Sequence, residues 1–288
     1  MSKIFFKGKN LSTAFLIAFL ILTCGILMSL KVKTDHIARE KIPGSTFIYI
    51  PSGKFLKYAT FGYSSLLADL IYIWSIQYYS DPSILDRFES LDHTFSIIAE
   101  LDPHYLDPYE IGAIIAVYDA KDLETAFKIL DRGLEKNPDQ WIFPYQAGHY
   151  AQMKKKDHKL AQKYYRETMK IEGAPDAVKR LYADTAYKLA DLQTSWKSWL
   201  KIYQKAKDER IRKIASNHLY QVKVAADIQM IKEALRKFKE KYSRNPLDLT
   251  QLVQAGFLTK IPKDLDGKDY LYDSQTEDVK ASIQWWKR

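Results

Sequence analysis

The longest apolar stretch of the chain lies near its N-terminus. Residues 11–30 contain no charged side chain, and a helix of this length is about 30 Å long, which matches the apolar core of a bilayer. Residues 1–30 are therefore predicted to hold a short cytoplasmic tail and a transmembrane anchor. An uncleaved signal anchor is favoured over a cleaved signal peptide because the stretch is long. A lipoprotein signal acylated at Cys24 is disfavoured because Thr23 is larger than the residue that usually precedes such a cysteine.

Charges beside this stretch are nearly balanced. Three lysines precede it, and four basic residues follow it by residue 41. The positive-inside rule therefore gives no clear orientation. A short N-terminal tail favours a cytoplasmic N-terminus in a bacterial single-pass protein. This predicts location in the bacterial inner membrane, with the bulk of the chain in the periplasm.

Residues 31–59 read as a linker and entry segment. Residues 43–45 (Pro-Gly-Ser) and 51–53 (Pro-Ser-Gly) are turn signals. The apolar residues 46–50 between them predict a short extended piece.

Beyond residue 60, apolar residues recur at helical spacing. The pattern predicts helices at residues 63–79 and 84–100. Pro103, Pro138 and Pro175 then interrupt it at intervals of 35 and 37 residues, and each proline ends one helix and allows the next to begin. Helix pairs repeated at about 34 residues are typical of a stacked helical array.

Small and large residues occur at fixed offsets in these pairs. Ala126 and Gly133 are small, Leu130 between them is large, and Pro138 follows. Small residues let two helix axes approach, and the large residue fills the groove between them. This pattern resembles the tetratricopeptide repeat (TPR), and the third unit has one extra residue in the turn at residues 154–157. Matching positions in the third and fourth units are Gly148, Ala151, Ala161, Tyr165, Ala183, Ala186, Ser195, Trp199 and Ile202.

The resemblance covers residues 60–222 and implies an inner groove lined by the first helix of each unit. It places Tyr145, His149 and Gln152 on one wall and Arg180, Asp184 and Tyr187 on the next. Such a mixture of side chains suits a bound peptide or helix. Packing against the neighbouring unit is the alternative for each residue, and binding is favoured for Tyr145, Arg180 and Tyr187.

Residues 223–288 differ from the array. The array is predicted to end with a short helix at 208–222. After it, the pattern predicts a charged helix at 225–242, a Pro-started short helix ending at Gly256, and a β-hairpin. The order resembles the globular end of type II secretion pseudopilins and type IV pilins. The residues that carry this resemblance are Pro246, Leu249, Leu252, Gly256, Phe257, Leu258, Pro262, Asp264, Gly267 and Tyr270. The prepilin-type cleavage motif is missing, which argues against a filament subunit.

The expected fold class is therefore all-α. It comprises an N-terminal transmembrane helix, a TPR-like helical-repeat solenoid and a small C-terminal α+β appendix with a β-hairpin. Charge is distributed unevenly along this architecture. Residues 60–140 carry 5 basic and 15 acidic side chains, whereas residues 151–245 carry 24 basic and 11 acidic ones. This uneven charge would orient a bound partner or favour contact with an anionic surface. Solvated helix faces explain it equally well.

No motif for catalysis is present. The 6 histidines show no metal-ligand spacing, and neither a phosphate-binding glycine loop nor a nucleophile elbow occurs. We therefore expect no enzyme activity, no cofactor and no metal, and neither nucleic acid nor a small-molecule substrate as partner. The single cysteine excludes an intramolecular disulfide.

These observations predict a membrane-anchored scaffold that binds partner proteins in an envelope assembly such as pilus or secretion machinery. The alternative is an obligate structural subunit of a larger membrane complex. Only a weak small-residue face on the apolar stretch, around Ala14 and Ala18, supports that alternative. An enzyme with an unrecognised site has the least support.

Overall fold

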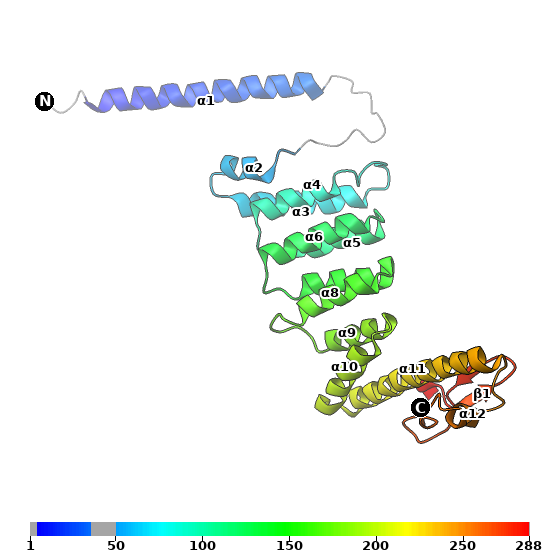
Figure 1. Cartoon of the computed structure of the whole chain (residues 1–288). Helices are drawn as coiled ribbons and strands as arrows, with labels where there is room; N and C mark the ends of the chain where they lie inside the picture. Colours follow the sequence, from blue (N-terminus) through cyan, green and yellow to red (C-terminus); the bar gives the residue numbers. More distant parts are fainter. Residues whose placement is uncertain (1–4, 36–49, 288) are drawn as a thin grey trace. The chain divides into compact units, whose positions relative to one another are not determined.

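The computed structural model describes residues 5–35 and 50–287 of the chain, with side chains at residues 15–33 in the first range. The chain divides into two compact units. One unit contains helix α1 and residues 82–87, and the other contains residues 50–81 and 88–288. In the described residues, helices predominate, and one small antiparallel sheet lies near the C-terminus (Figure 1).

Helix α1 (Phe5–Asp35) contains the predicted apolar stretch. Its segment Phe15–Lys33 is long enough and apolar enough to cross a membrane, and none of it is buried. A signal sequence near an N-terminus has the same properties. The helix extends past residue 30 into the region predicted to be a linker, because residues 31–35 contain neither Gly nor Pro to end it.

The predicted linker also contains a second helix, α2 (Gly53–Ala59). Its first residue packs closely on another helix, since a Cβ at Gly53 would lie 2.6 Å from the Cβ of Glu100. The Lys54 N–H donates to Glu100 Oε2 at 2.9 Å, which satisfies one of the free N–H groups at the start of α2. The turn predicted at 51–53 is therefore a helix start. The turn predicted at 43–45 lies outside the described residues, as does the extended piece at 46–50 apart from Ile50.

Eight helices follow, and each contacts the next one along the chain (Figure 1). The prediction of a helix at 63–79 is confirmed, whereas the one at 84–100 begins only at Leu91. Residues 84–90 form turns instead, in which Arg87 Nη1 donates to the carbonyl of Ile84 at 3.0 Å. The bounds are α3 (Ser64–Ser80), α4 (Leu91–Leu101), α5 (Asp107–Tyr118), α6 (Leu123–Lys136), α7 (Ile142–Tyr150), α8 (His158–Thr168), α9 (Ala177–Lys188) and α10 (Leu192–Lys205).

The same turn geometry occurs before α6, α8 and α10. In each turn one residue adopts a positive φ, and the aspartate after it accepts a hydrogen bond from a backbone N–H three residues on. Such an aspartate stabilises the start of a helix. The pairs are Lys121-Asp122, Lys156-Asp157 and Ala190-Asp191.

Buried residues recur at matching offsets in α4, α6, α8 and α10. Each helix buries a large residue four positions after another buried residue. In the last three helices the first member is small, which allows close approach of the axes. The pairs are Leu91 and Phe95, Ala126 and Leu130, Ala161 and Tyr165, and Ser195 and Trp199, all at most 2% exposed.

The extra residue predicted at 154–157 has a structural counterpart. A short π-helix, η1 (Ala151–Lys155), continues α7 before the turn. A π-helical turn accommodates one inserted residue without ending the helix. The insertion is therefore absorbed at the end of α7, and the turn at Lys156 keeps the geometry of the other two turns.

Gly148 is a site where helix packing permits no side chain. A Cβ there would lie 2.6 Å from Cε1 and 2.7 Å from Cδ1 of Tyr165, whose ring is buried between α7 and α8. We expect Gly148→Val to lower the free energy of unfolding by about 2 kcal/mol, because overpacking a core costs about 1–3 kcal/mol. Urea denaturation of the full chain in detergent, followed by circular dichroism, measures this change.

The matched control is His149→Val, on the adjacent exposed position of the same helix. Its expected change is within about 0.5 kcal/mol. Equal stability of the two variants would show that the Tyr165 ring moves aside at little cost, contrary to the prediction.

The prediction of separate helices at 208–222 and 225–242 is wrong. Helix α11 (Glu209–Tyr242) is continuous, and no Gly or Pro occurs in it. Its first half packs in a cluster with Trp199 of α10, through residues such as Leu219 and Val222. Its second half packs in a different cluster, through residues such as Ile231 and Phe238. Tertiary packing on both halves keeps the helix intact where the sequence pattern changes.

The C-terminal elements follow the predicted order. Helix α12 (Thr250–Gln254) ends before Gly256, which has a φ of +77°. Strands β1 (Leu271–Asp273) and β2 (Asp278–Lys280) then pair in antiparallel register with Tyr272 opposite Val279, so the hairpin prediction is confirmed. A final 3-10 turn, η2 (Trp285–Lys287), contacts α11.

Candidate functional site

Five of the six residues predicted to line a groove lie on α7 and α9, and the sixth, Gln152, lies on η1. Tyr145 and His149 are one turn apart on α7, and Arg180, Asp184 and Tyr187 follow the same spacing on α9. All five side chains are exposed or half-buried. Helical spacing at i and i+4 places such residues along one face of each helix.

Tyr145, His149 and Arg180 keep their polar groups available. No hydrogen bond or ion pair to another described residue engages the Tyr145 hydroxyl, the His149 ring or the Arg180 guanidinium. The Tyr145 ring packs edge-on against Trp141 at 5.8 Å, and the His149 ring lies 6.2 Å from that of Tyr150. Aromatic contacts therefore orient the two α7 side chains without using their hydrogen-bonding groups.

Asp176, the residue immediately before α9, is an acidic neighbour of the Arg180 guanidinium. Asp176 forms an ion pair with Lys179 at 2.5 Å. This hydrogen bond and the charge of Lys179 lower the pKa of Asp176, and Arg180 adds a smaller effect in the same direction. Since Lys179 already neutralises the carboxylate, the Arg180 charge remains available to an external anion or carboxylate.

Asp184 and Tyr187 are used within the fold. The Asp184 carboxylate accepts a hydrogen bond from Gln152 Nε2 at 3.0 Å and pairs with Lys188 at 3.2 Å. Gln152, also predicted to line the groove, is buried and accepts a hydrogen bond from the Tyr165 hydroxyl at 2.8 Å. Tyr187 packs against the cluster around Trp199. These contacts connect α9 to η1 and α8 and to the next helices.

Helix α5 contributes residues that the sequence reasoning missed. Ile114 and Tyr118 are exposed on α5, and Met153 is exposed on η1. The Lys154 ammonium lies 4.3 Å from the centre of the Tyr118 ring. The overlooked signal was the 35-residue spacing, because Ile114 precedes His149 by 35 residues and Tyr118 precedes Met153 by 35. We call these three residues together with Tyr145, His149 and Arg180 the odd-helix surface.

Glu110 lies beside this surface, on α5. Its Oε2 accepts a hydrogen bond from Gln146 Nε2 of α7 at 2.9 Å. Partial burial raises the pKa of Glu110, and the charge of Asp107 raises it further, while the bond from Gln146 acts in the opposite direction. The contact connects α5 to α7, as the contact between Gln152 and Asp184 connects η1 to α9.

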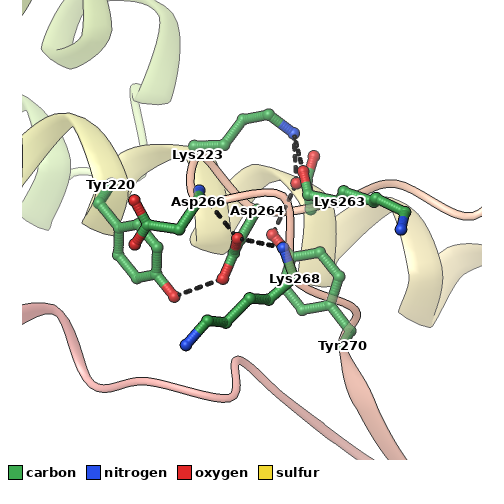
Figure 2. Close-up of polar contacts among 8 residues, drawn as sticks. Tyr220, Lys223, Lys263, Asp264, Asp266, Lys268 and Tyr270 are labelled. Carbon is green, nitrogen blue, oxygen red and sulfur yellow. Dashed lines mark hydrogen bonds and ion pairs between the residues drawn. The ribbon is translucent and has the colours of Figure 1, made fainter.

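A buried polar network holds the C-terminal loop against α11 (Figure 2). Asp264 Oδ2 accepts a hydrogen bond from the Tyr220 hydroxyl at 2.8 Å, and Oδ1 accepts from the backbone N–H groups of Asp266 and Lys268, each at 2.9 Å. The Asp264 N–H also donates to the carbonyl of Lys268. A single carboxylate thus determines the conformation of the loop between Pro262 and Tyr270.

A second buried carboxylate, Asp227, lies on α11. Its Oδ2 accepts from the Tyr270 hydroxyl at 2.6 Å and pairs with the Lys223 ammonium. Burial raises the pKa of the Tyr270 hydroxyl, and its bond to Asp227 raises it further. Lys223 also donates to the carbonyl of Lys263 at 3.4 Å (Figure 2). Every member of this network therefore has a partner inside the fold.

Neither a family model nor a curated protein matches this chain. Among the residues that the structure describes, no group of three His, Cys, Asp or Glu side chains is arranged to hold a metal ion. The odd-helix surface and the apolar residues of α1 both expose side chains that could contact another molecule.

Proposed function

We propose that this chain is a membrane-anchored, non-enzymatic scaffold whose TPR-like helices bind a protein partner on the odd-helix surface. The observation that carries the proposal is the recurrence of turns at Lys121, Lys156 and Ala190, with the same buried offsets in the helices after them. A helix-pair array of this kind exposes one face of its first helices to a partner.

The odd-helix surface has the composition of a peptide-binding face. Ile114, Tyr118 and Met153 supply apolar contact area, and Arg180 supplies a guanidinium with no ion pair in the described part of the chain. Tyrosine and arginine are enriched at the energetic centres of protein interfaces. A peptide or helix that carries apolar anchors and a carboxylate fits this combination.

The apolar segment of α1 supports the membrane anchor. Under the proposal the chain is a single-pass protein of the bacterial inner membrane, with its helical array in the periplasm. The pilin-like pattern from Pro246 to Tyr270 supports a role in pilus or secretion machinery, where this module docks to another component or covers the last helices.

Photo-crosslinking in cells tests the partner. With Tyr145→benzoylphenylalanine we expect a discrete adduct to one protein, and with the same change at Lys128, exposed on α6, we expect none. Adding Arg180→Glu is expected to reduce the Tyr145 adduct about tenfold, equivalent to about 1.4 kcal/mol of binding free energy. Charge reversal has this effect because Arg180 forms no ion pair within the described residues, so its guanidinium is available to a carboxylate of the partner, which a glutamate would repel.

The level and helical content of each variant serve as the folding control. No adduct from Tyr145, or equal adducts from Tyr145 and Lys128, would contradict the proposed surface. An adduct that Arg180→Glu leaves unchanged would remove the arginine from it.

A further inference from the structure

Outside α1, exposed large apolar side chains are most concentrated from α2 to the middle of α3. Seven large apolar residues within residues 53–73 are each at least 55% exposed. A patch of this kind on a folded domain usually marks a contact surface. The residues are Phe55, Tyr58, Phe61, Tyr63, Leu66, Leu70 and Ile73, here called the α2–α3 apolar face.

The fold does not need these side chains for its core. Helix α3 buries Ala68, Ile71 and Ser75 on its other side, toward α4. Leu66, Leu70 and Ile73 recur at i, i+4 and i+7 and therefore form a separate stripe. Helix α2 likewise contacts α4, with Gly53 at the interface. Helix α3 is thus apolar on two sides.

Phe61 is the most exposed of the seven. It is 92% exposed and has a φ of +50°, a conformation that is costly for a bulky residue. A hydrogen bond from the Thr60 hydroxyl to the carbonyl of Lys57 at 2.9 Å stabilises the turn before it. Glycine would suit this position better if only the turn mattered. An aromatic ring held outward at such a cost indicates a contact outside the core.

The chemistry of the face matches a lipid surface. Phe and Tyr rings are enriched at the level of lipid headgroups, and lysines beside them bind anionic headgroups. Lys54 and Lys57 alternate with the rings of α2, and Asp69 is the only acidic residue between residues 53 and 73. A protein-binding face of this size would normally carry more polar partners for hydrogen bonding.

If α1 crosses a membrane, the length of the connecting segment limits how far this face can lie from it. Nineteen residues lie between Lys33, the end of the apolar segment, and Gly53, and a chain of that length spans at most about 70 Å. We propose that the α2–α3 apolar face rests on the surface of the bilayer that α1 crosses, with its rings at the headgroup level. This inference rests on the anchor in the proposed function.

Spin labels on the full chain in liposomes of phosphatidylethanolamine and phosphatidylglycerol (3:1) test the contact. Single cysteines are introduced by Phe61→Cys, Leu70→Cys and, as a control on α10, Gln193→Cys, each combined with Cys24→Ser. We expect collisions with a water-soluble nickel complex to be several-fold less frequent at the first two labels than at the control, and collisions with oxygen to be more frequent. Equal accessibility at all three labels would overturn the inference.

A label on the native Cys24 separates the two possible failures. If that label lies in lipid while the Phe61 and Leu70 labels lie in water, the anchor stands and only this inference fails. If the Cys24 label lies in water, the anchor and the inference both fail. Protection at Phe61 that rises with protein density would mean a second copy of the chain rather than lipid, and would also overturn the inference.

A variant with charges on the α3 stripe is expected to lose the membrane contact. Leu66→Glu combined with Ile73→Glu changes only exposed positions, so helical content should stay constant. We expect this pair to make the Phe61 label as accessible to the nickel complex as the Gln193 control. Continued protection of the label would contradict a role for the α3 stripe.

Discussion

Replacing Trp199 by alanine is expected to lower the free energy of unfolding by about 3–5 kcal/mol. The indole is 2% exposed and packs in a cluster with Ala183 of α9 and Leu219 of α11. Its removal both exposes apolar surface and leaves a cavity that rigid helices fill only partly. Urea denaturation of the full chain in detergent, followed by circular dichroism, measures the loss.

The effect is large because Trp199 also supports a ring stack. The ring of His218, on α11, stacks parallel to the indole with the ring centres 4.1 Å apart. The ring of Trp285, in η2, lies 4.9 Å from the ring of His218. Trp199 thus contributes to contacts among α10, α11 and η2. The control is Trp286→Ala, at a position that is 61% exposed, with an expected change within about 0.5 kcal/mol. A loss below about 1 kcal/mol for Trp199→Ala would contradict this packing.

Trp199 also illustrates how far sequence reasoning reached. Its offset from Ser195 matched that of Leu130 from Ala126, and the structure buries all four residues. Such offsets follow from the periodicity of the helix, so they can be read from residue spacing in the sequence. The helix at 63–79 and the C-terminal hairpin were predictable for the same reason.

Features that depend on tertiary contacts were not predictable. Helix α11 continues through residues 222–225 because clusters pack on both of its halves. Helix α2 forms in an expected linker because α4 supplies Glu100 to its first turn. Both outcomes were decided by partners distant in the sequence, which a single sequence does not identify.

The candidate surface shows the same division. Helical spacing identified Tyr145, His149 and Arg180, whose polar groups point to no partner among the described residues. It also selected Asp184, whose carboxylate is occupied by Gln152 and Lys188. Spacing indicates which side of a helix a residue occupies but gives no information on hydrogen bonds between helices.

Replacing Asp264 by alanine is expected to destabilise the C-terminal module by about 3–4 kcal/mol. The substitution leaves the Tyr220 hydroxyl and the N–H groups of Asp266 and Lys268 without their acceptor. Hydrogen bonds to a charged group contribute about 1.5–3 kcal/mol each, and water entering the loop recovers part of the loss. Hydrogen exchange of the amides in β1 and β2, measured by mass spectrometry, reports the stability of this module separately from the other helices.

The pH dependence of this effect has a defined sign. Burial raises the pKa of Asp264, but the bonds from the Lys268 N–H, the Tyr220 hydroxyl and the Asp266 N–H together lower it below the ordinary value of 3.8. A carboxylate whose pKa is lower in the folded state stabilises the fold above its unfolded pKa and loses that effect as the pH falls through its folded pKa. The difference in stability between the wild type and Asp264→Asn should therefore be constant from about pH 5 to 7 and shrink below about pH 4.

Asp269→Ala is the matched control for the loop. Asp269 is exposed, and its ion pair with Lys263 at 3.4 Å is solvent-accessible, so its removal should cost no more than about 0.5 kcal/mol. Similar losses for Asp264→Ala and Asp269→Ala would mean that general loop charge, rather than the buried acceptor, stabilises the module. Faster exchange confined to Asp264→Ala would instead identify its carboxylate as the group that holds the loop on α11, because the two variants remove the same charge from the same loop.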